Sequence, residues 1–139
     1  RRRSRRASRP RGCTARRSAA ALACAVIGLG ASVASALDFW TAEPAFCADA
    51  GCATVRSSAW AHPLGVPMPV LGVAYFALAI ALVFVERPRL RRALALAGAA
   101  WATALIAVQA FAIHAWCKLC LIADPAAIGY ALAVIAGAR

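Results

Sequence analysis

Residues 93–113 read ALALAGAAWATALIAVQAFAI, an apolar run without a single charged side chain. A helix needs about 20 predominantly apolar residues to cross the hydrocarbon core of a bilayer. Three further stretches come close to that length, and they are Ser18–Ala36, Val66–Val85 and Leu119–Ala138. The sequence therefore predicts an all-α integral membrane protein built as a four-helix bundle.

Prolines and polar residues indicate where these helices begin and end. Pro67 and Pro69 suit a first helical turn, because that turn does not need the amide donor that proline lacks. We expect helices at about 18–36, 69–85, 93–113 and 119–138, an outside loop at 37–68, and a disordered basic tail at 1–17. Asp124 is an exception within the last helix, since a carboxyl group is costly in lipid unless it faces a pocket or the interface.

The charge distribution predicts orientation rather than nucleic-acid binding. The formal net charge is +11, but the first 17 residues hold nine arginines and no acid, which leaves +2 for the rest. A nucleic-acid-binding protein spreads its basic residues over a folded face. Cytoplasmic segments are rich in Arg and Lys, so the tail, residues 86–92 and Arg139 place both termini in the cytoplasm. The excess of arginine over lysine indicates a bacterial protein, and hence the bacterial cytoplasmic (inner) membrane.

The first apolar segment has a second interpretation. An arginine-rich start, an apolar run and the sequence Ala34-Ser35-Ala36 also resemble a cleaved signal peptide. The run is longer than the 7–15 apolar residues typical of such peptides. We therefore expect an uncleaved first membrane helix.

The predicted topology sorts the six cysteines into two groups. Cys13 lies in the tail and Cys24 in the first helix, and we assign no chemistry to them. The other four are predicted on the extracytoplasmic face, and they are Cys47, Cys52, Cys117 and Cys120. An even number of cysteines in an oxidising compartment usually means disulfides.

The sequence CKLC at 117–120 has the spacing of a redox-active pair. Residues three apart are neighbours on a helix, so the two sulfurs can close a disulfide. Amide donors and the positive end of the helix dipole favour a thiolate there, and Lys118 adds a cation. A structural zinc site and purely structural disulfides remain alternatives for the four cysteines. Leu121 stands where covalent haem attachment needs a histidine, which excludes that motif.

Three features in order along the chain resemble the vitamin K epoxide reductase family. They are the loop CADAGCATVRSS at 47–58, the sequence LGVP at 64–67 entering the second helix, and CKLC opening the last helix. The resemblance covers about residues 18–138 and is to bacterial stand-alone members, without a fused thioredoxin-like domain. It implies a four-helix membrane bundle whose loop between the first two helices covers a quinone pocket on the periplasmic side.

The resemblance also implies an activity, quinone-coupled thiol–disulfide oxidoreduction, with menaquinone or ubiquinone as electron acceptor and no metal. In the family the pair matching Cys117 and Cys120 is the active-site disulfide, with Cys120 on the quinone side. The pair matching Cys47 and Cys52 carries electrons from the dithiol of a thioredoxin-like protein. We expect a separate DsbA-like partner, whose re-oxidation drives disulfide formation outside the cytoplasm.

Three residues are candidates for the quinone pocket. Ser58 matches a serine that the family keeps near the site, Asp124 stands where animal members have a tyrosine, and Gln109 lies near the outer end of the third helix. Asp124 is alternatively a carboxylate favoured by the helix dipole, and Gln109 alternatively forms an interhelical hydrogen bond. The second helix lacks the asparagine of animal members, so we do not predict epoxide reduction. The alternative of another class is a non-enzymatic membrane scaffold or assembly factor with structural disulfides.

Overall fold

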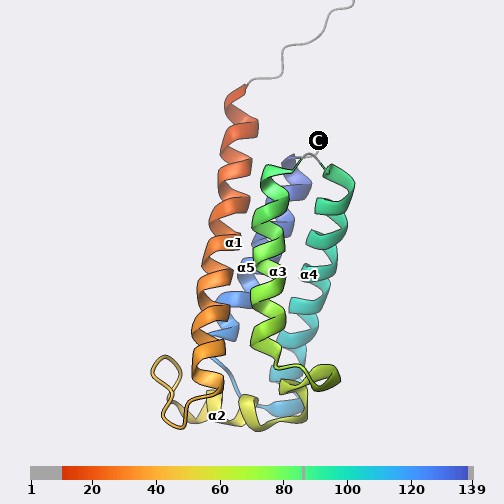
Figure 1. Cartoon of the computed structure of the whole chain (residues 1–139). Coiled ribbons are helices and arrows are strands. Elements are labelled where there is room, and N and C mark those ends of the chain that lie inside the picture. Colours follow the sequence, from red (N-terminus) through yellow and green to blue (C-terminus); the bar gives the residue numbers. More distant parts are fainter. Residues whose placement is uncertain (1–10, 86, 138–139) are drawn as a thin grey trace, which may run out of the picture.

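The computed structural model describes residues 11–85 and 87–137, and every regular element within them is helical. Four long helices are present there, and they are α1 (Arg11–Phe39), α3 (Met68–Phe84), α4 (Pro88–Val108) and α5 (Cys120–Gly137). They run side by side, and the long connection between α1 and α3 folds across one end (Figure 1). The all-α prediction is confirmed.

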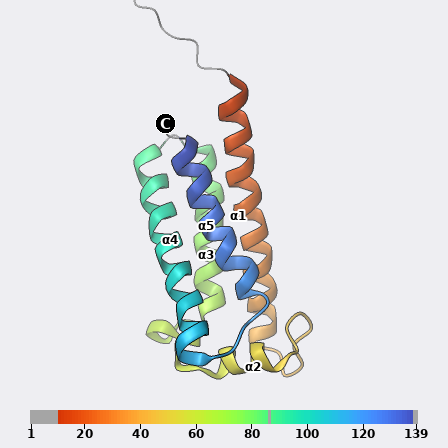
Figure 2. The same ribbon diagram turned by 180° about the vertical axis from the view of Figure 1, so that it is seen from behind.

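Helix α5 holds the bundle together. It packs against both α1 and α4, and α1 also packs against α3. Seen from behind, α5 crosses between α4 and α1 while α3 lies on the far side (Figure 2). The start of α1 and the end of α5 share the end of the bundle opposite the short helix α2 (Ala50–Ser57).

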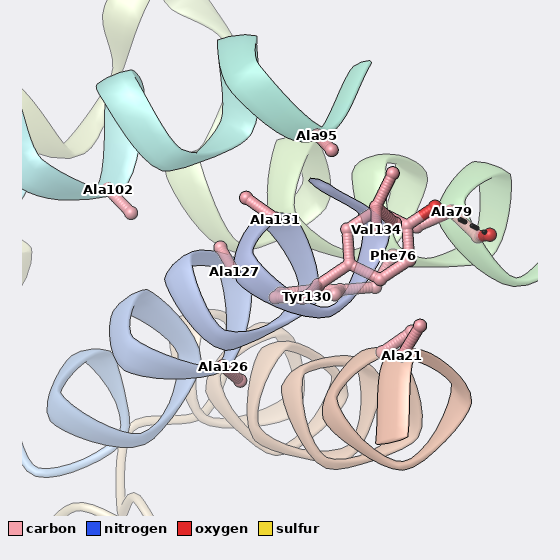
Figure 3. Close-up of a cluster of buried hydrophobic side chains, with 11 residues drawn as sticks. Ala21, Phe76, Ala79, Ala95, Ala102, Ala126, Ala127, Tyr130, Ala131 and Val134 are labelled. Carbon is pink, nitrogen blue, oxygen red and sulfur yellow. Dashed lines mark hydrogen bonds between the residues drawn. The ribbon is translucent and has the colours of Figure 1, made fainter. Parts of the chain in front are cut away.

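The core of the bundle is built largely from alanine. Small side chains let helix backbones approach closely in a lipid environment. Phe76 and Tyr130 are the two large side chains in this core, and the Tyr130 hydroxyl donates a hydrogen bond of 3.3 Å to the backbone oxygen of Ala79 (Figure 3). The buried cluster comprises Ala21, Ala25, Phe76, Ala79, Ala95, Ala102, Ala126, Ala127, Tyr130, Ala131 and Val134.

Two glycines admit aromatic rings into the helix contacts. The ring of Phe76 lies where a Cβ on Gly28 would stand, and the ring of Tyr75 lies where a Cβ on Gly98 would stand. Any larger residue at these positions must displace a ring from a close-packed interior. The two glycines therefore fix how α3 meets α1 and α4.

Three helices in the described residues are long and apolar enough to cross a membrane, and they are Arg16–Phe39, Pro88–Ile113 and Cys120–Gly137. Helix α3 is apolar as well but has only 17 residues. The four apolar segments of the sequence thus all form helices, although one is shorter than a typical membrane span.

The connection between α1 and α3 contains more regular structure than the loop predicted at 37–68. It includes α2 and two 3₁₀ turns, η1 (Ala59–Ala61) and η2 (Pro63–Gly65). Asp49 caps α2, because its carboxylate accepts a hydrogen bond of 3.0 Å from the Cys52 amide. Asp is among the residues preferred at this position.

The start of α1 corrects the predicted tail. Residues 11–17 were expected to be disordered, but α1 begins at Arg11, while residues 1–10 lie outside the described part of the chain. The Arg17 guanidinium donates to the backbone oxygen of Ala136 at the end of α5. This contact places the end of α5 beside Arg17, and the part of α1 before it extends past the ends of the other helices (Figure 1).

Helix α4 starts earlier and ends less regularly than predicted. It begins at Pro88, which suits a first helical position. Beyond Val108 the chain forms a π-helical turn, η3 (Gln109–Ile113), and ends in His114 with a left-handed φ of 54°. Such π turns inside helices occur frequently at functional sites.

Candidate functional site

Four cysteine sulfurs meet at the end of the bundle that carries α2. Cys47 and Cys52 form a disulfide with a Cα–Cα distance of 5.8 Å. The sulfur of Cys117 lies 3.5 Å from that of Cys52, and both residues are buried. Cys117 and Cys120 are free thiols, and the Cys120 amide donates to the Cys117 sulfur over 3.5 Å. A formed disulfide thus faces a dithiol across a direct sulfur contact.

Helix α2 positions Cys52 against Cys117 through two contacts at its first turn. The Asp49 carboxylate forms an ion pair of 2.8 Å with the Lys118 ammonium group, next to Cys117. Gly51 touches the backbone oxygen of Trp116, where any Cβ would overlap it. The ion pair lowers the pKa of Asp49 and raises that of Lys118. The ion pair and the close contact at Gly51 therefore both hold α2 against the segment that precedes α5.

A buried carboxylate holds the other loop cysteine. Asp38 is 5% exposed, and its carboxylate accepts hydrogen bonds from the amides of Ala45, Phe46 and Cys47, the last at 2.7 Å. The Arg56 guanidinium donates to the Asp38 backbone oxygen over 2.7 Å. Asp38 therefore joins the end of α1 to the Cys47 segment and to α2.

Sequence reasoning missed this role of Asp38. The predicted first helix ends at residue 36, which puts Asp38 in the loop, whereas the structure places it in the last turn of α1. A carboxylate there is unfavourable with respect to the helix dipole, so another group must compensate for it. The compensating groups are backbone amides seven to nine residues later. No side-chain pattern marks such donors in a sequence.

We expect Asp38→Asn to loosen the Cys47 segment. An amide offers one acceptor where the carboxylate offers two, and its NH₂ group faces amide donors. Loss of these charge-assisted bonds costs about 2–3 kcal/mol of local stability. Limited proteolysis between residues 40 and 49 should then be at least about tenfold faster than in the wild type, since 2–3 kcal/mol corresponds to that or more. Glu43→Gln, which changes an exposed carboxylate of the same loop, is the control and should leave the rate unchanged.

Cys117 has the surroundings of a reactive cysteine. The hydrogen bond from the Cys120 thiol and the amides of Cys120 and Leu119 lower the pKa of Cys117 to about 6, against burial and the Asp49 carboxylate. A thiolate is the attacking species in thiol–disulfide exchange. At neutral pH the nucleophile is therefore present 3.5 Å from a disulfide sulfur.

A buried polar pair links Cys117 to α5. Gln109 in η3 is 3% exposed, and its Oε1 accepts a 3.0 Å hydrogen bond from the Cys117 amide. Its Nε2 donates to Oδ2 of Asp124 over 3.5 Å. Asp124 is 6% exposed and lies one turn after Cys120. The amide of Gln109 thus connects η3, the Cys117 segment and α5, which is the interhelical contact considered from the sequence.

A cavity of about 460 Å³ opens beside these residues. Its wall comes from α1, α3, α4, α5 and the loop, and it is mainly apolar. The lining includes Gln109, Asp124 and the four clustered cysteines, which are Cys47, Cys52, Cys117 and Cys120. Ligand pockets for small molecules have about this size and character.

Residues 19–136 match the sequence model of the vitamin K epoxide reductase family. The chain belongs to this family. The match extends from the first turns of α1 to the end of α5, so it includes the whole cysteine cluster and the cavity. No curated protein and no solved structure gives a significant match.

Membership in the vitamin K epoxide reductase family agrees with the rest of the molecule. Together with three helices able to cross a membrane, it identifies an integral membrane protein. The family's chemistry is thiol–disulfide oxidoreduction, and the structure contains a disulfide between Cys47 and Cys52.

Ser58 is one family-derived candidate that the structure places elsewhere. Its hydroxyl donates to the backbone oxygen of Val55 over 2.7 Å and closes the end of α2. It is not among the residues that line the cavity. The expectation that Ser58 belongs to a quinone pocket stays a prediction, and the hydrogen bond of its hydroxyl is made within α2.

Metal binding competes with disulfide formation at this site. The sulfurs of Cys47, Cys52 and Cys117 lie within 4.8 Å of one another, close enough to share an ion. Zinc binds thiolates, and the sulfurs of Cys47 and Cys52 are joined to each other. A zinc site with these ligands therefore requires prior reduction of the disulfide.

Proposed function

We propose that this protein is a quinone-coupled thiol–disulfide oxidoreductase that re-oxidises a thioredoxin-like, DsbA-like partner and so drives disulfide formation outside the cytoplasm. The observation that carries the proposal is the 3.5 Å contact between Cys52 of a disulfide and Cys117 of a dithiol. A purely structural disulfide does not require a thiolate next to it.

The exchange steps conserve atoms and electrons. A thiolate of the partner attacks the Cys47–Cys52 disulfide, and the second partner thiol resolves the mixed disulfide, which leaves the loop reduced and the partner oxidised. The Cys52 thiolate then attacks Cys117 of the oxidised Cys117–Cys120 pair and releases Cys120. Cys47 attacks Cys52, which restores the loop disulfide and leaves two electrons on Cys117 and Cys120. The arrangement of thiols and disulfide described above corresponds to this last state.

The cavity fits a quinone as the final acceptor. Its apolar wall suits a lipid-soluble ring, and Gln109 and Asp124 offer polar atoms next to Cys120. A quinone takes up two electrons and two protons, which regenerates the Cys117–Cys120 disulfide. Cys120 is then the sulfur on the quinone side, and Gln109 and Asp124 are pocket residues.

The membrane arrangement follows from the arginines. We place α3 as a fourth span alongside the three longer helices. Arg87, Arg89, Arg91 and Arg92 precede or open α4 at the end of the bundle opposite α2. The positive-inside rule assigns that end to the cytoplasm. The cysteine cluster then faces the periplasm of a bacterial inner membrane, where a separate partner protein reaches it.

The proposal is tested by dithiothreitol-driven reduction of short-chain ubiquinone and menaquinone analogues by the purified protein in detergent. We expect turnover with at least one quinone and a fall of ~1000-fold or more in Cys120→Ala, because the variant cannot form the disulfide that delivers the electrons. Cys24→Ala is the matched control, since Cys24 lies in α1 outside the cavity lining and should keep full activity.

Absence of turnover in folded wild-type protein with both quinones would overturn the proposal. The four outside cysteines would then be structural staples. Undiminished turnover in Cys120→Ala would instead contradict the assignment of Cys120 to the quinone side.

A further inference from the structure

The buried pair Gln109 and Asp124 has a geometry that the electron relay alone does not explain. One oxygen of Asp124 accepts from Gln109 over 3.5 Å, and the other makes no hydrogen bond within residues 11–85 and 87–137. That second oxygen is not among the enclosed atoms without a partner, and Asp124 lines the cavity. The free carboxyl oxygen is therefore accessible from the cavity, one helical turn from Cys120.

The proposed reaction needs one proton more than the Cys117–Cys120 pair supplies. Closing the Cys117–Cys120 disulfide delivers two electrons, and converting a quinone into a quinol consumes two protons. The Cys120 thiol and the amides of Cys120 and Leu119 lower the pKa of Cys117, so the pair with a Cys117 thiolate holds a single proton, on Cys120. A second proton must come from another group that reaches the cavity.

Most of the other ionisable groups near the cysteines are engaged in hydrogen bonds or ion pairs, or lie on another helix than Cys120. The Asp38 carboxylate accepts hydrogen bonds from the amides of residues 45–47. Lys118 is 74% exposed, pairs with Asp49, and neither residue lines the cavity. Tyr75 also lines the cavity and has a hydroxyl without a hydrogen-bond partner in the described part of the chain, but it lies on α3 against Gly98 and not on the helix of Cys120. Asp124 is the carboxyl group that shares both a helix face and the cavity with Cys120.

We propose that Asp124 donates the second proton to the quinone when Cys117 and Cys120 close their disulfide, and that Gln109 is a positioning residue that aims the carboxyl group. This inference rests on the proposed function. Asp124 donates a proton from its free carboxyl oxygen and becomes a carboxylate, and water on the outer side of the membrane returns a proton to it. The Gln109 amide holds the carboxyl group in place through Oδ2 and is itself held by the Cys117 amide.

Asp124→Asn separates proton donation from shape. The variant keeps the size of the side chain and its contact with Gln109 but cannot transfer a proton to the acceptor. We expect kcat for quinone reduction to fall by about 100-fold, the usual contribution of a general acid, with KM for the quinone within about threefold of the wild-type value. Formic acid, which is small enough to enter the cavity, should restore part of the lost rate.

Two further variants keep the test decisive. Asp124→Glu retains a carboxyl group and should stay within about tenfold of wild-type kcat, which controls for a folding defect in Asp124→Asn. Gln109→Met should lower kcat rather than raise KM. Combined with Asp124→Asn, it should produce no further loss, because the two residues act as a unit.

The outcomes separate this inference from the proposed function. Wild-type turnover together with an unchanged kcat in Asp124→Asn would overturn proton donation and leave the electron relay intact. A loss in Asp124→Asn that formic acid does not relieve and that appears as a raised KM would assign Asp124 to quinone binding instead. No turnover in the wild type would remove both proposals.

Discussion

The double variant Cys47→Ala/Cys120→Ala should form a Cys52–Cys117 disulfide in essentially every molecule under mild oxidation with diamide. Each of these two sulfurs has lost its usual partner, and they lie 3.5 Å apart in a buried site. Reactive groups held at such a distance behave as if their concentration were very high, with effective molarities of about 10⁵ M or more. This variant arrests the relay at the step that joins the loop to the helix pair.

Thiol counting with a maleimide reagent checks this result. Of the six cysteines four remain in the variant, and two of them should be blocked after oxidation. The matched control is Cys52→Ala/Cys120→Ala, which leaves Cys47 opposite Cys117. Its sulfur makes no contact with Cys117 comparable to that of Cys52 within the described residues, so oxidation should be about tenfold slower. Equal rates in the two variants would show that the loop does not present Cys52 specifically.

The second large effect, on the rate of Cys52–Cys117 disulfide formation, is expected for Gly51→Ala. A methyl group here would overlap the backbone oxygen of Trp116, which no side-chain rotation can relieve. Helix α2 must then move away and take Cys52 with it. A misplacement of about 1 Å between reacting atoms costs about 100-fold in rate, so Cys52–Cys117 disulfide formation in the trapping variant should slow by that factor.

The direction of this effect is opposite to that of helix propensity. Alanine favours a helix over glycine by about 0.5–1 kcal/mol. If the contact with Trp116 has no importance, Gly51→Ala should therefore stabilise α2 and not slow the trapping reaction. Gly30→Ala in α1 provides the control, because open space surrounds that glycine. It should leave the trapping rate unchanged. A trapping rate in Gly51→Ala equal to that of Gly30→Ala would contradict the role of the contact.

Much of the helical framework was predictable because it depends on composition over long stretches. The run 93–113 and its three counterparts lie within or close to the observed helices, since apolar length alone requires a helix in a bilayer. The four cysteines that the sequence grouped together also lie in one cluster, with Cys120 packed against Cys47, Cys52 and Cys117. These features depend on many residues at once, so that single side chains do not change the result.

The parts that were not predicted depend on individual contacts. Gln109 reaches both Cys117 and Asp124 from a π-helical turn, and periodicity based on 3.6 residues does not anticipate that turn. Asp38 looked like an ordinary loop acid but binds backbone amides, which every residue has. The register between α2 and the Trp116 segment depends on one missing Cβ at Gly51. Such contacts form only in the folded chain, so they cannot be inferred from its composition.

With α3 placed as a fourth span, as proposed above, its 17 residues also affect the surrounding lipid. At 1.5 Å per residue the helix is about 26 Å long, which is less than the hydrocarbon thickness of about 30 Å. A bilayer next to such a helix becomes thinner, or the flanking turns sink into it. Met68 and Pro69 at the outer end of α3 line the cavity, so this thinning falls beside its wall. In the proposed arrangement the shortest helix thus sets the depth at which a molecule dissolved in the membrane meets the cysteines.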